Sequence, residues 1–378
     1  ASDVYKRQHK ACLAIAAAVS LLAGSVWGTG TGFAKEIDPN DPDYNTPGFP
    51  LPTVENDEND SPLTGGRIDW GITDDTPAPF TVLNYGGLPL PVDNFVNIGD
   101  SYTTTAFYAT TLPEPCFHNA IGFATAVGAQ TGLAVRDAAC AGAGIPFYWH
   151  TMKSFQFPVA KAPQRLAIDK HTKLVVVSLG GNDTYTNSMI AVLAGCIASW
   201  SIPKYYNQGN PCARKMAPEM MPRAKALVPA LTYMYKDAKK RAAKDAVVIA
   251  MGYFNPLPMN TENCLIDGPA PKGDLKFINE IFTVINRSIR TAAKKAGVLY
   301  YNPSAEQTYA QTSCGAPFAR MISITGLPEY SVPFHPTLTG HYNAAEHVVK
   351  LYNQELTARQ RGTTIAPQTW KAPYHPAN

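Results

Sequence analysis

The sequence predicts a three-layer α/β/α sandwich around a mostly parallel, five-stranded sheet. Short apolar runs rich in β-branched residues alternate along the chain with longer stretches of helical periodicity. Strand, helix and strand at this spacing indicate a parallel sheet covered on both faces by crossover helices. With 378 residues, 45% hydrophobic and only 16% charged, the chain can bury such a core, which excludes a wholly disordered or collagen-like protein.

Each strand and helix of this sandwich is predicted by its own pattern. Strands are expected at 95–98, 133–135, 173–179, 246–250 and 298–301, and 133–135 is the weakest of them. A single helix face collects Leu275, Ile278, Ile281, Phe282, Ile285 and Ile289, and we expect Asp274 to cap that helix and Gly297 to end it. A second helix is expected over 223–243, with Leu227, Leu231, Met234 and Tyr235 inward and its lysines outward.

The amino-terminal part of the chain predicts export. Residues 1–8 lack an initiator Met and have the character of cloning residue, and a basic stretch then precedes an apolar run over 11–27. Small residues up to Ala34 follow, so we expect a signal peptide over 1–34 that is cleaved before Lys35. The alternative, a membrane anchor, is disfavoured because about 20 apolar residues are needed to span a bilayer. The mature protein is therefore expected to be secreted, without an integral membrane span.

The remaining chain is expected to form three parts. Residues 35–90 carry eleven acidic and two basic side chains among many prolines, which predicts an acidic, Pro-rich linker or arm. Residues 91–362 form the main domain, and 363–378 form a carboxy-terminal tail. From residue 91 onward, 27 basic and 17 acidic side chains give a basic body. Because no Arg/Lys run with interleaved aromatic residues occurs, no nucleic-acid partner is expected.

The cysteines support an oxidising compartment. Six remain after the leader is removed: Cys116, Cys140, Cys196, Cys212, Cys264 and Cys314. The even number predicts three disulfides, although fifteen pairings are possible from this count alone. No two of these cysteines have the close spacing of a zinc site, so no metal is expected.

Three turns that follow predicted strands carry residues suited to acyl chemistry. They span 99–102, 140–144 and 180–183, and parallel strands bring such turns to one edge of the sheet. Ser101 offers a nucleophilic hydroxyl and its own N–H, Gly142 offers a backbone N–H that is easy to approach, and Asn182 offers a side-chain amide. A tetrahedral oxyanion needs such a nucleophile with two or three donors about 3 Å from the developing charge.

A serine hydroxyl also needs a base, and His335 is the best candidate. Pro336 fits the turn that enters the last predicted helix, which leaves His335 on the preceding loop at the edge of the sheet. His341 is the alternative, although it is expected at or near that helix. The other mature histidines are expected to be structural or exposed.

These residues resemble the four sequence blocks of the SGNH (GDSL-type) hydrolases. The blocks are 97–102, 139–143, 180–183 and 335–337, and the likeness extends from residue 91 to about 355. It is strongest to the secreted actinobacterial lipase/esterase branch. The resemblance implies an SGNH or flavodoxin-like fold, hydrolysis of carboxylic esters without a cofactor, and the pairs Cys116–Cys140, Cys196–Cys212 and Cys264–Cys314.

The resemblance also implies roles for the site residues. Ser101 would be the nucleophile, Gly142 and Asn182 would complete the oxyanion hole with Ser101, and His335 would be the base. Many relatives place an Asp three residues before the catalytic His, where this chain has Val332, so we expect the backbone carbonyl of Val332 to orient the imidazole. Glu329 is the competing candidate for that role. The chain also has Ala141 where the branch commonly has Ser, a small change that need not disturb the Gly142 N–H.

The expected activity is hydrolysis of an ester substrate, a lipid or another acylated molecule, by a monomer. An acyltransferase that passes the acyl group to an envelope lipid or sugar stays open, because it would use the same acyl-enzyme. A non-catalytic secreted binding module is the alternative from another class. A conventional α/β-hydrolase is disfavoured because the chain contains no G-x-S-x-G elbow.

Overall fold

The computed structural model describes residues 82–83, 92–105, 116–153, 160–185, 211–258 and 271–371, together with Met189, Leu193, Cys196 and Cys264. The expected signal peptide lies outside the described residues. So does the expected linker or arm, apart from residues 82–83.

A six-stranded sheet forms the centre of the described part, in the order β1-β3-β2-β6-β7-β8. Its strands are β1 (Val82–Leu83), β2 (Asn94–Gly99), β3 (Ala134–Asp137), β6 (Thr172–Ser178), β7 (Val247–Met251) and β8 (Leu299–Tyr301). The last five are parallel, which confirms the predicted five-stranded sheet. Strand β1 pairs antiparallel with β3 at the edge, so this short piece of the linker lies on the body as an arm.

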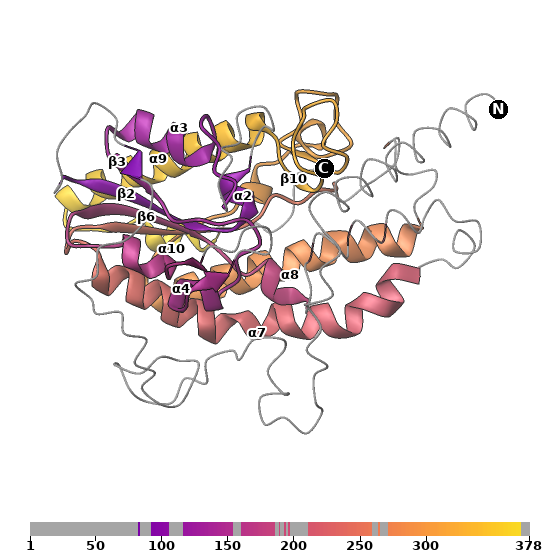
Figure 1. The fold of residues 1–378 in the computed structure, drawn as a ribbon, viewed down its shortest axis with the longest axis horizontal. Helices are drawn as coiled ribbons and strands as arrows, with labels where there is room; N and C mark the ends of the chain where they lie inside the picture. The colour runs from indigo at the N-terminus through magenta and orange to yellow at the C-terminus, as the bar shows by residue number, and fades with distance from the viewer. Residues whose placement is uncertain are drawn as a thin grey trace, which may run out of the picture.

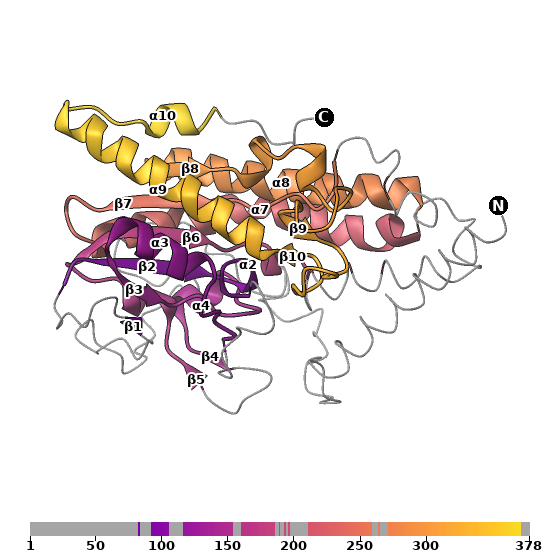
Figure 2. The same cartoon turned by 90° about the horizontal axis from the view of Figure 1, so that it is seen from above.

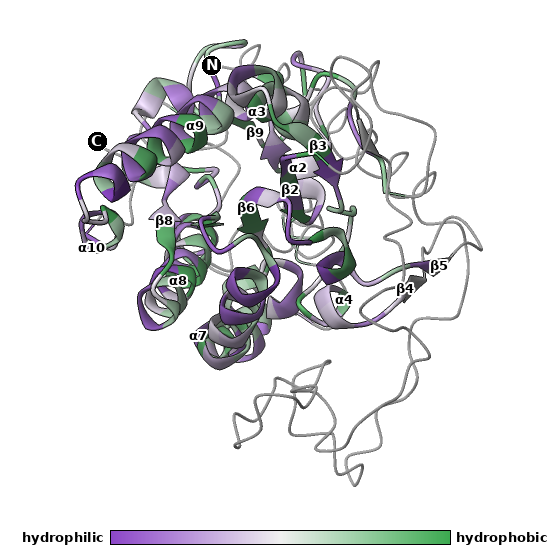
Figure 3. Ribbon diagram, turned by 90° about the vertical axis from the view of Figure 1, so that its left-hand side faces the viewer, coloured by the Kyte–Doolittle hydropathy of each residue, from purple (hydrophilic) through white to green (hydrophobic). Residues whose placement is uncertain are grey.

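Helices cover both faces of the sheet and complete the predicted sandwich (Figure 1). On one face, α7 (Pro211–Arg241) packs against α8 (Lys272–Ala296), and on the other α3 (Phe123–Thr131) packs against α9 (Leu338–Gln360). The short helices are α2 (Ser101–Thr104), α4 (Pro146–Trp149) and α10 (Ala366–Thr369). Figure 3 shows the apolar strands β2 and β6 inside a ring of amphipathic helices.

Single-turn helices and two short hairpins lie in the connections. The turns are η2 (Gln164–Ala167), η3 (Asn182–Thr184), η4 (Pro303–Ala305) and η5 (Tyr309–Gln311). One hairpin pairs β4 (Met152–Lys153) with β5 (Ala160–Lys161), and the other pairs β9 (Ile322–Ser323) with β10 (His335–Pro336). None of the helices in the described part of the chain is both long and apolar enough to cross a membrane.

The strand order reverses direction at β2, between β3 and β6. The chain leaves β2 for β3 on one side and later returns to β6 on the other side. Ligands bind outside the carboxyl ends of parallel strands at such a reversal, because the connections there diverge. All six residues of β2 are buried, which fixes the backbone that leads to this edge of the sheet.

Helix α8 matches its prediction closely, whereas α7 begins twelve residues before the predicted start. The αL conformation of Gly297, with φ 65°, ends α8. Three prolines inside α7, Pro218, Pro222 and Pro229, argue against a helix in the sequence. All three are exposed, so the backbone carbonyls left unpaired by the missing N–H groups face water.

Two expectations need correction, one about the start of α8 and one about the carboxy-terminal tail. Asp274 does not cap its own helix, whose N-cap residue is Pro271; its buried carboxylate accepts hydrogen bonds from the backbone N–H groups of Cys212 and Ala213 and so caps the neighbouring α7. The described part of the expected tail, residues 363–371, packs on the body, because the Tyr300 N–H donates to Thr369 Oγ1 and the Trp370 indole donates to a carbonyl just before β8. The folded domain therefore extends to residue 371 at least.

Candidate active site

Ser101 lies immediately after β2, at the start of the short helix α2. The Asp100 carboxylate caps this helix by accepting the Tyr102 N–H at 2.9 Å. Gly99 precedes Asp100, and a Cβ at that position would lie 2.3 Å from the Thr103 hydroxyl, so any larger residue would have to displace the Thr103 side chain. The turn leaves the Ser101 side chain half-buried at the carboxyl end of the sheet.

His335 lies against Ser101. Its Nε2 is 2.7 Å from the Ser101 hydroxyl, and its Nδ1 is 2.8 Å from the Pro333 carbonyl oxygen. A carbonyl only accepts, so the Nδ1–H donates to it and Nε2 is left to accept the serine proton. Burial lowers the pKa of His335 to about 4, although the Pro333 carbonyl acts in the opposite direction. The ring is therefore uncharged at neutral pH.

The carbonyl that holds the imidazole belongs to Pro333, and not to Val332 as expected. The Val332 carbonyl accepts the backbone N–H of His335 at 3.1 Å, which closes a tight turn. Phe334 within that turn has φ 62°, and this conformation brings the carbonyl of Pro333 beside the ring. Glu329 does not take the role either, since its carboxylate accepts the N–H of Phe318.

Gly142 and Asn182 lie on the two neighbouring turns. Gly142 is exposed and has φ 79°, a conformation that favours glycine. The Asn182 amide donates to the Ala143 carbonyl at 3.0 Å, which ties its side chain to the Gly142 turn and leaves its second N–H for another acceptor. No acceptor among the described residues is bonded to the backbone N–H of Ser101 or of Gly142.

His341, the alternative base, has a structural position. Its Nδ1 accepts the Phe123 N–H at 3.0 Å, and its Nε2 donates to the Thr105 carbonyl at 3.1 Å. Burial lowers its pKa to about 3, with the Thr105 carbonyl opposing. Both ring nitrogens are thus committed to backbone groups, and neither reaches Ser101.

The structure adds a residue that the sequence did not single out, Tyr253. Its hydroxyl donates to Asp100 Oδ2 at 2.7 Å and accepts the Gly181 N–H at 2.9 Å, so it joins the turn that carries Ser101 to the turn that carries Asn182. Its place two residues after β7, at the same edge of the sheet, was the available signal.

Two buried carboxyl groups, those of Asp100 and Asp183, fix these turns by hydrogen bonds from inside the molecule. Burial raises the pKa of Asp100 to about 7 against the opposing hydrogen bonds of Tyr253 and Tyr102, and Asp183 adds to the shift. Asp183 accepts the Ile145 N–H with both oxygens, which fixes the end of the Gly142 turn, and burial raises its pKa to about 7 as well. In the described residues, no group of three or more His, Cys, Asp or Glu side chains is arranged to hold a metal ion.

Replacing Tyr253 by Phe is expected to lower kcat about tenfold with little change in KM. The Gly181 N–H and the Asp100 oxygen lose their shared partner, which costs about 1–3 kcal/mol of folding free energy and loosens both turns. Steady-state kinetics and urea unfolding measure the two effects. Tyr235→Phe is the matched control, because Tyr235 is equally buried and its hydroxyl has no partner in the described part of the structure. Equal kinetics in the two variants would contradict a positioning role for Tyr253.

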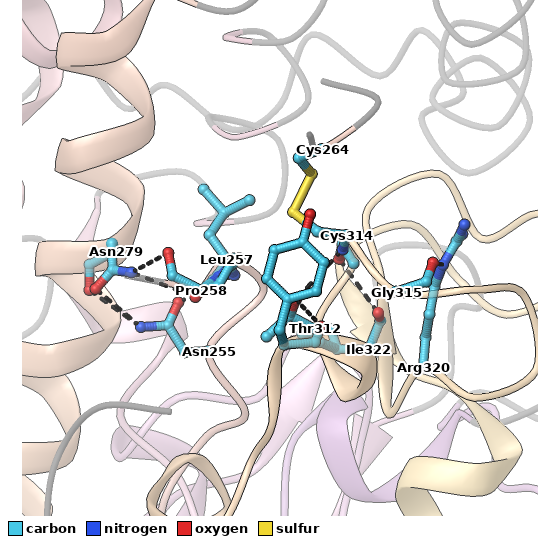
Figure 4. The surroundings of a disulfide bond; sticks show 12 residues. Asn255, Leu257, Pro258, Cys264, Asn279, Thr312, Cys314, Gly315, Arg320 and Ile322 are labelled. Carbon is cyan, nitrogen blue, oxygen red and sulfur yellow. Dashed lines mark hydrogen bonds between the residues drawn. A yellow bond between two sulfur atoms is a disulfide. The ribbon is translucent and has the colours of Figure 1, made fainter. Parts of the chain in front are cut away.

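The disulfides agree with the pairing that the family resemblance implied. Cys116 pairs with Cys140, Cys196 with Cys212, and Cys264 with Cys314. The first anchors the start of the Gly142 turn, since Cys140 is two residues before Gly142. The third anchors the segment that leads to His335 (Figure 4).

Comparisons with known proteins find matches at three levels: a family model, a curated relative and solved structures. The sequence model described as the GDSL-like Lipase/Acylhydrolase family matches residues 98–342. "Lipase 2" from Streptomyces coelicolor is 27% identical over 295 residues, which cover 75% of this chain and 92% of that protein. The structure of an extracellular lipase from Streptomyces rimosus aligns with a TM-score of 0.53 at 20% identity, covering 68% of this chain and 99% of its own, and has the same fold.

Proposed function

This chain belongs to the GDSL-like lipase/acylhydrolase family and is a carboxylic ester hydrolase, and we propose that it is a secreted serine esterase or lipase whose catalytic pair is Ser101 and His335. The observation that carries the proposal is the 2.7 Å hydrogen bond between Ser101 Oγ and His335 Nε2. It is supported by the Pro333 carbonyl, which fixes the ring in the tautomer that can accept a proton.

In the first half of the proposed reaction, His335 Nε2 takes the serine proton as Oγ attacks the ester carbonyl carbon. The charge that develops on the carbonyl oxygen is received by the N–H groups of Ser101 and Gly142 and by the Asn182 amide. The bond to the alcohol then breaks, and the alcohol leaves with the proton that His335 held. An acyl-enzyme on Ser101 remains.

In the second half, water replaces the alcohol. His335 takes a proton from the water as its oxygen attacks the acyl carbon, and the same donors receive the charge again. Collapse of the intermediate releases the carboxylic acid, and His335 returns the proton to the Ser101 oxygen. The neutral ring at the start of each half is favoured by the low pKa of His335.

Three observations support secretion and an acyl ester substrate. The disulfides of the described chain are typical of oxidising compartments. The basic and apolar stretch within residues 1–34 is typical of a signal peptide. The two relatives described above are named as lipases, one of them extracellular, which favours a lipid ester.

Labelling by a p-nitrophenyl alkylphosphonate tests the proposal. One adduct per chain is expected, located on Ser101 by peptide mass spectrometry. Because an imidazolium cannot accept the serine proton, the labelling rate should stay high from neutral pH downward and be lost as pH falls through about 4, the pKa of buried His335.

Circular dichroism at each pH separates titration from unfolding. An adduct on another residue would overturn the assignment of the nucleophile. A midpoint near 6.5, the ordinary value of histidine, would show that water reaches the ring in the working enzyme.

A further inference from the structure

The segment that carries His335 is unusually poor in charge. Between Gln307 and Ala345, Arg320 and Glu329 are the only Lys, Arg, Asp or Glu residues, whereas the overall charged fraction of 16% would give about six in 39 residues. Both are buried, with Arg320 Nη1 3.7 Å from Glu329 Oε1. The outer surface of this segment therefore has no formal charge.

The buried pair organises the segment from inside. Arg320 donates to the carbonyls of Gly315 and Leu327, and Glu329 accepts the N–H of Phe318. Figure 4 shows Arg320 against Gly315, beside the disulfide between Cys264 and Cys314. These contacts hold the backbones of residues 315–318 and 327–329 together within the segment.

Large apolar side chains cover that surface. In the described part of the chain, all four large hydrophobic residues that are exposed lie here: Phe318, Leu327, Tyr330 and Tyr342. Thr339, one turn before Tyr342, donates to the Phe318 carbonyl, which brings the start of α9 to the same place. We call these four residues the uncharged face.

Two of the aromatic residues occupy a backbone conformation that disfavours them. Phe318 has φ 63° and is 65% exposed, and Tyr330 has φ 54° and is 59% exposed. The left-handed region suits Gly or Asn, and a bulky side chain there is strained. More than half of each residue is exposed, so burial in the core does not account for a large aromatic residue at either position.

The uncharged face borders the proposed site. His335 lies five residues after Tyr330, and β10, which begins with His335, pairs with β9 inside the same segment. Figure 2 shows β9 and β10 next to α2, the helix that starts with Ser101. We propose that the uncharged face is the surface by which this enzyme binds a lipid–water interface, so that ester groups at the interface reach Ser101.

This inference rests on the proposed ester hydrolysis at Ser101. A lipid surface fits the face better than other occupants, because aromatic and aliphatic side chains insert at the boundary between headgroups and acyl chains. Charged side chains would be costly at the depth of the acyl chains. A polysaccharide would need hydrogen-bonding side chains for its hydroxyls, and the four residues offer only two phenols. Without charge on the face, binding should not depend on electrostatic attraction to anionic lipid.

Co-sedimentation with phosphatidylcholine vesicles tests the inference, with the double variant Phe318→Asn and Tyr330→Asn against the parent enzyme. Asn suits the left-handed backbone, so the variant is expected to keep its thermal stability and its turnover of soluble p-nitrophenyl acetate. Its vesicle affinity is expected to fall at least about tenfold, from the apolar area removed. Parent binding should persist in 0.5 M NaCl, because it is not electrostatic.

Two controls make the result specific. Gly362→Asn places the same residue at another exposed left-handed position, with φ 71°. Gly362 lies beyond the far end of α9, about 34 Å from the start of that helix. This variant should bind vesicles like the parent enzyme. Ser101→Ala should also bind vesicles fully, since the face and not the nucleophile makes the contact. A Ser101→Ala enzyme that still turned over ester would instead overturn the proposed function while leaving vesicle binding readable.

Several results would overturn the inference. Equal vesicle binding by the parent and the double variant would place the contact elsewhere. Binding lost in salt would assign it to the basic body, and loss of stability in the double variant would make the aromatic residues structural. Dimers that disappear in the double variant, without vesicle binding by the parent, would assign the face to self-association.

Discussion

Ser101→Ala is expected to lower kcat for p-nitrophenyl acetate by about 10⁵-fold or more, the scale seen when a serine nucleophile is removed from a hydrolase. The variant keeps the donors of the oxyanion hole but has no oxygen that can attack the carbonyl. Its fold should be unchanged, because the only described side-chain partner of the Ser101 hydroxyl is His335. Release of p-nitrophenol measures turnover, and thermal unfolding checks the fold.

Thr104→Val is the matched control for this substitution. Thr104 lies on the same short helix, and its buried hydroxyl has no hydrogen-bond partner in the described part of the chain. Valine keeps the shape of the side chain and replaces its unpaired hydroxyl by a methyl group, so kcat should stay within about twofold of the parent. Turnover in Ser101→Ala within tenfold of the parent would refute Ser101 as the nucleophile.

His335→Ala is expected to cost nearly as much, about 10⁴-fold or more in kcat, because the serine proton then has no acceptor. His341→Ala should have the opposite profile. It leaves the Phe123 N–H and the Thr105 carbonyl without their partner, which costs about 1–3 kcal/mol for each group, while folded enzyme retains its turnover.

Initial rates and urea unfolding on both variants separate these outcomes. The two histidines are suitably matched, since each is buried and each has a pKa lowered by burial. Retained turnover in His335→Ala together with its loss in His341→Ala would show that the base is His341.

The sheet was predictable because its strands are encoded locally. Each predicted strand overlaps an observed one, since a run such as Val175–Val177 within β6 has no stable place except the buried centre of a parallel sheet. The apolar face of α8 and the Gly297 that ends this helix could likewise be predicted from the residues of the helix alone. The Ser, Gly, Asn and His blocks could be found because each follows a strand or precedes a helix at the same edge of the sheet.

The remaining features depend on contacts that no local pattern carries. Asp274 caps a neighbouring helix by accepting the N–H of Cys212, 62 residues earlier, a partnership that exists only once α7 and α8 pack together. The Tyr253 hydroxyl finds Asp100 across 153 residues. The choice of the Pro333 carbonyl over that of Val332 follows from the positive φ of Phe334, an aromatic residue for which the sequence gives no reason to expect that conformation.

The hydrogen bond from His335 to the Pro333 carbonyl has a consequence for how this enzyme tolerates sequence change. On the proposed assignment, the group that aligns the base is main chain, and every amino acid carries one. No replacement of a side chain can delete it directly, as Asp→Ala deletes the acid of a Ser-His-Asp triad. Saturation mutagenesis would therefore find two positions in the proton-transfer chain, instead of three, at which substitution inactivates the enzyme. Residues 332 and 333 would tolerate substitution wherever the turn is preserved.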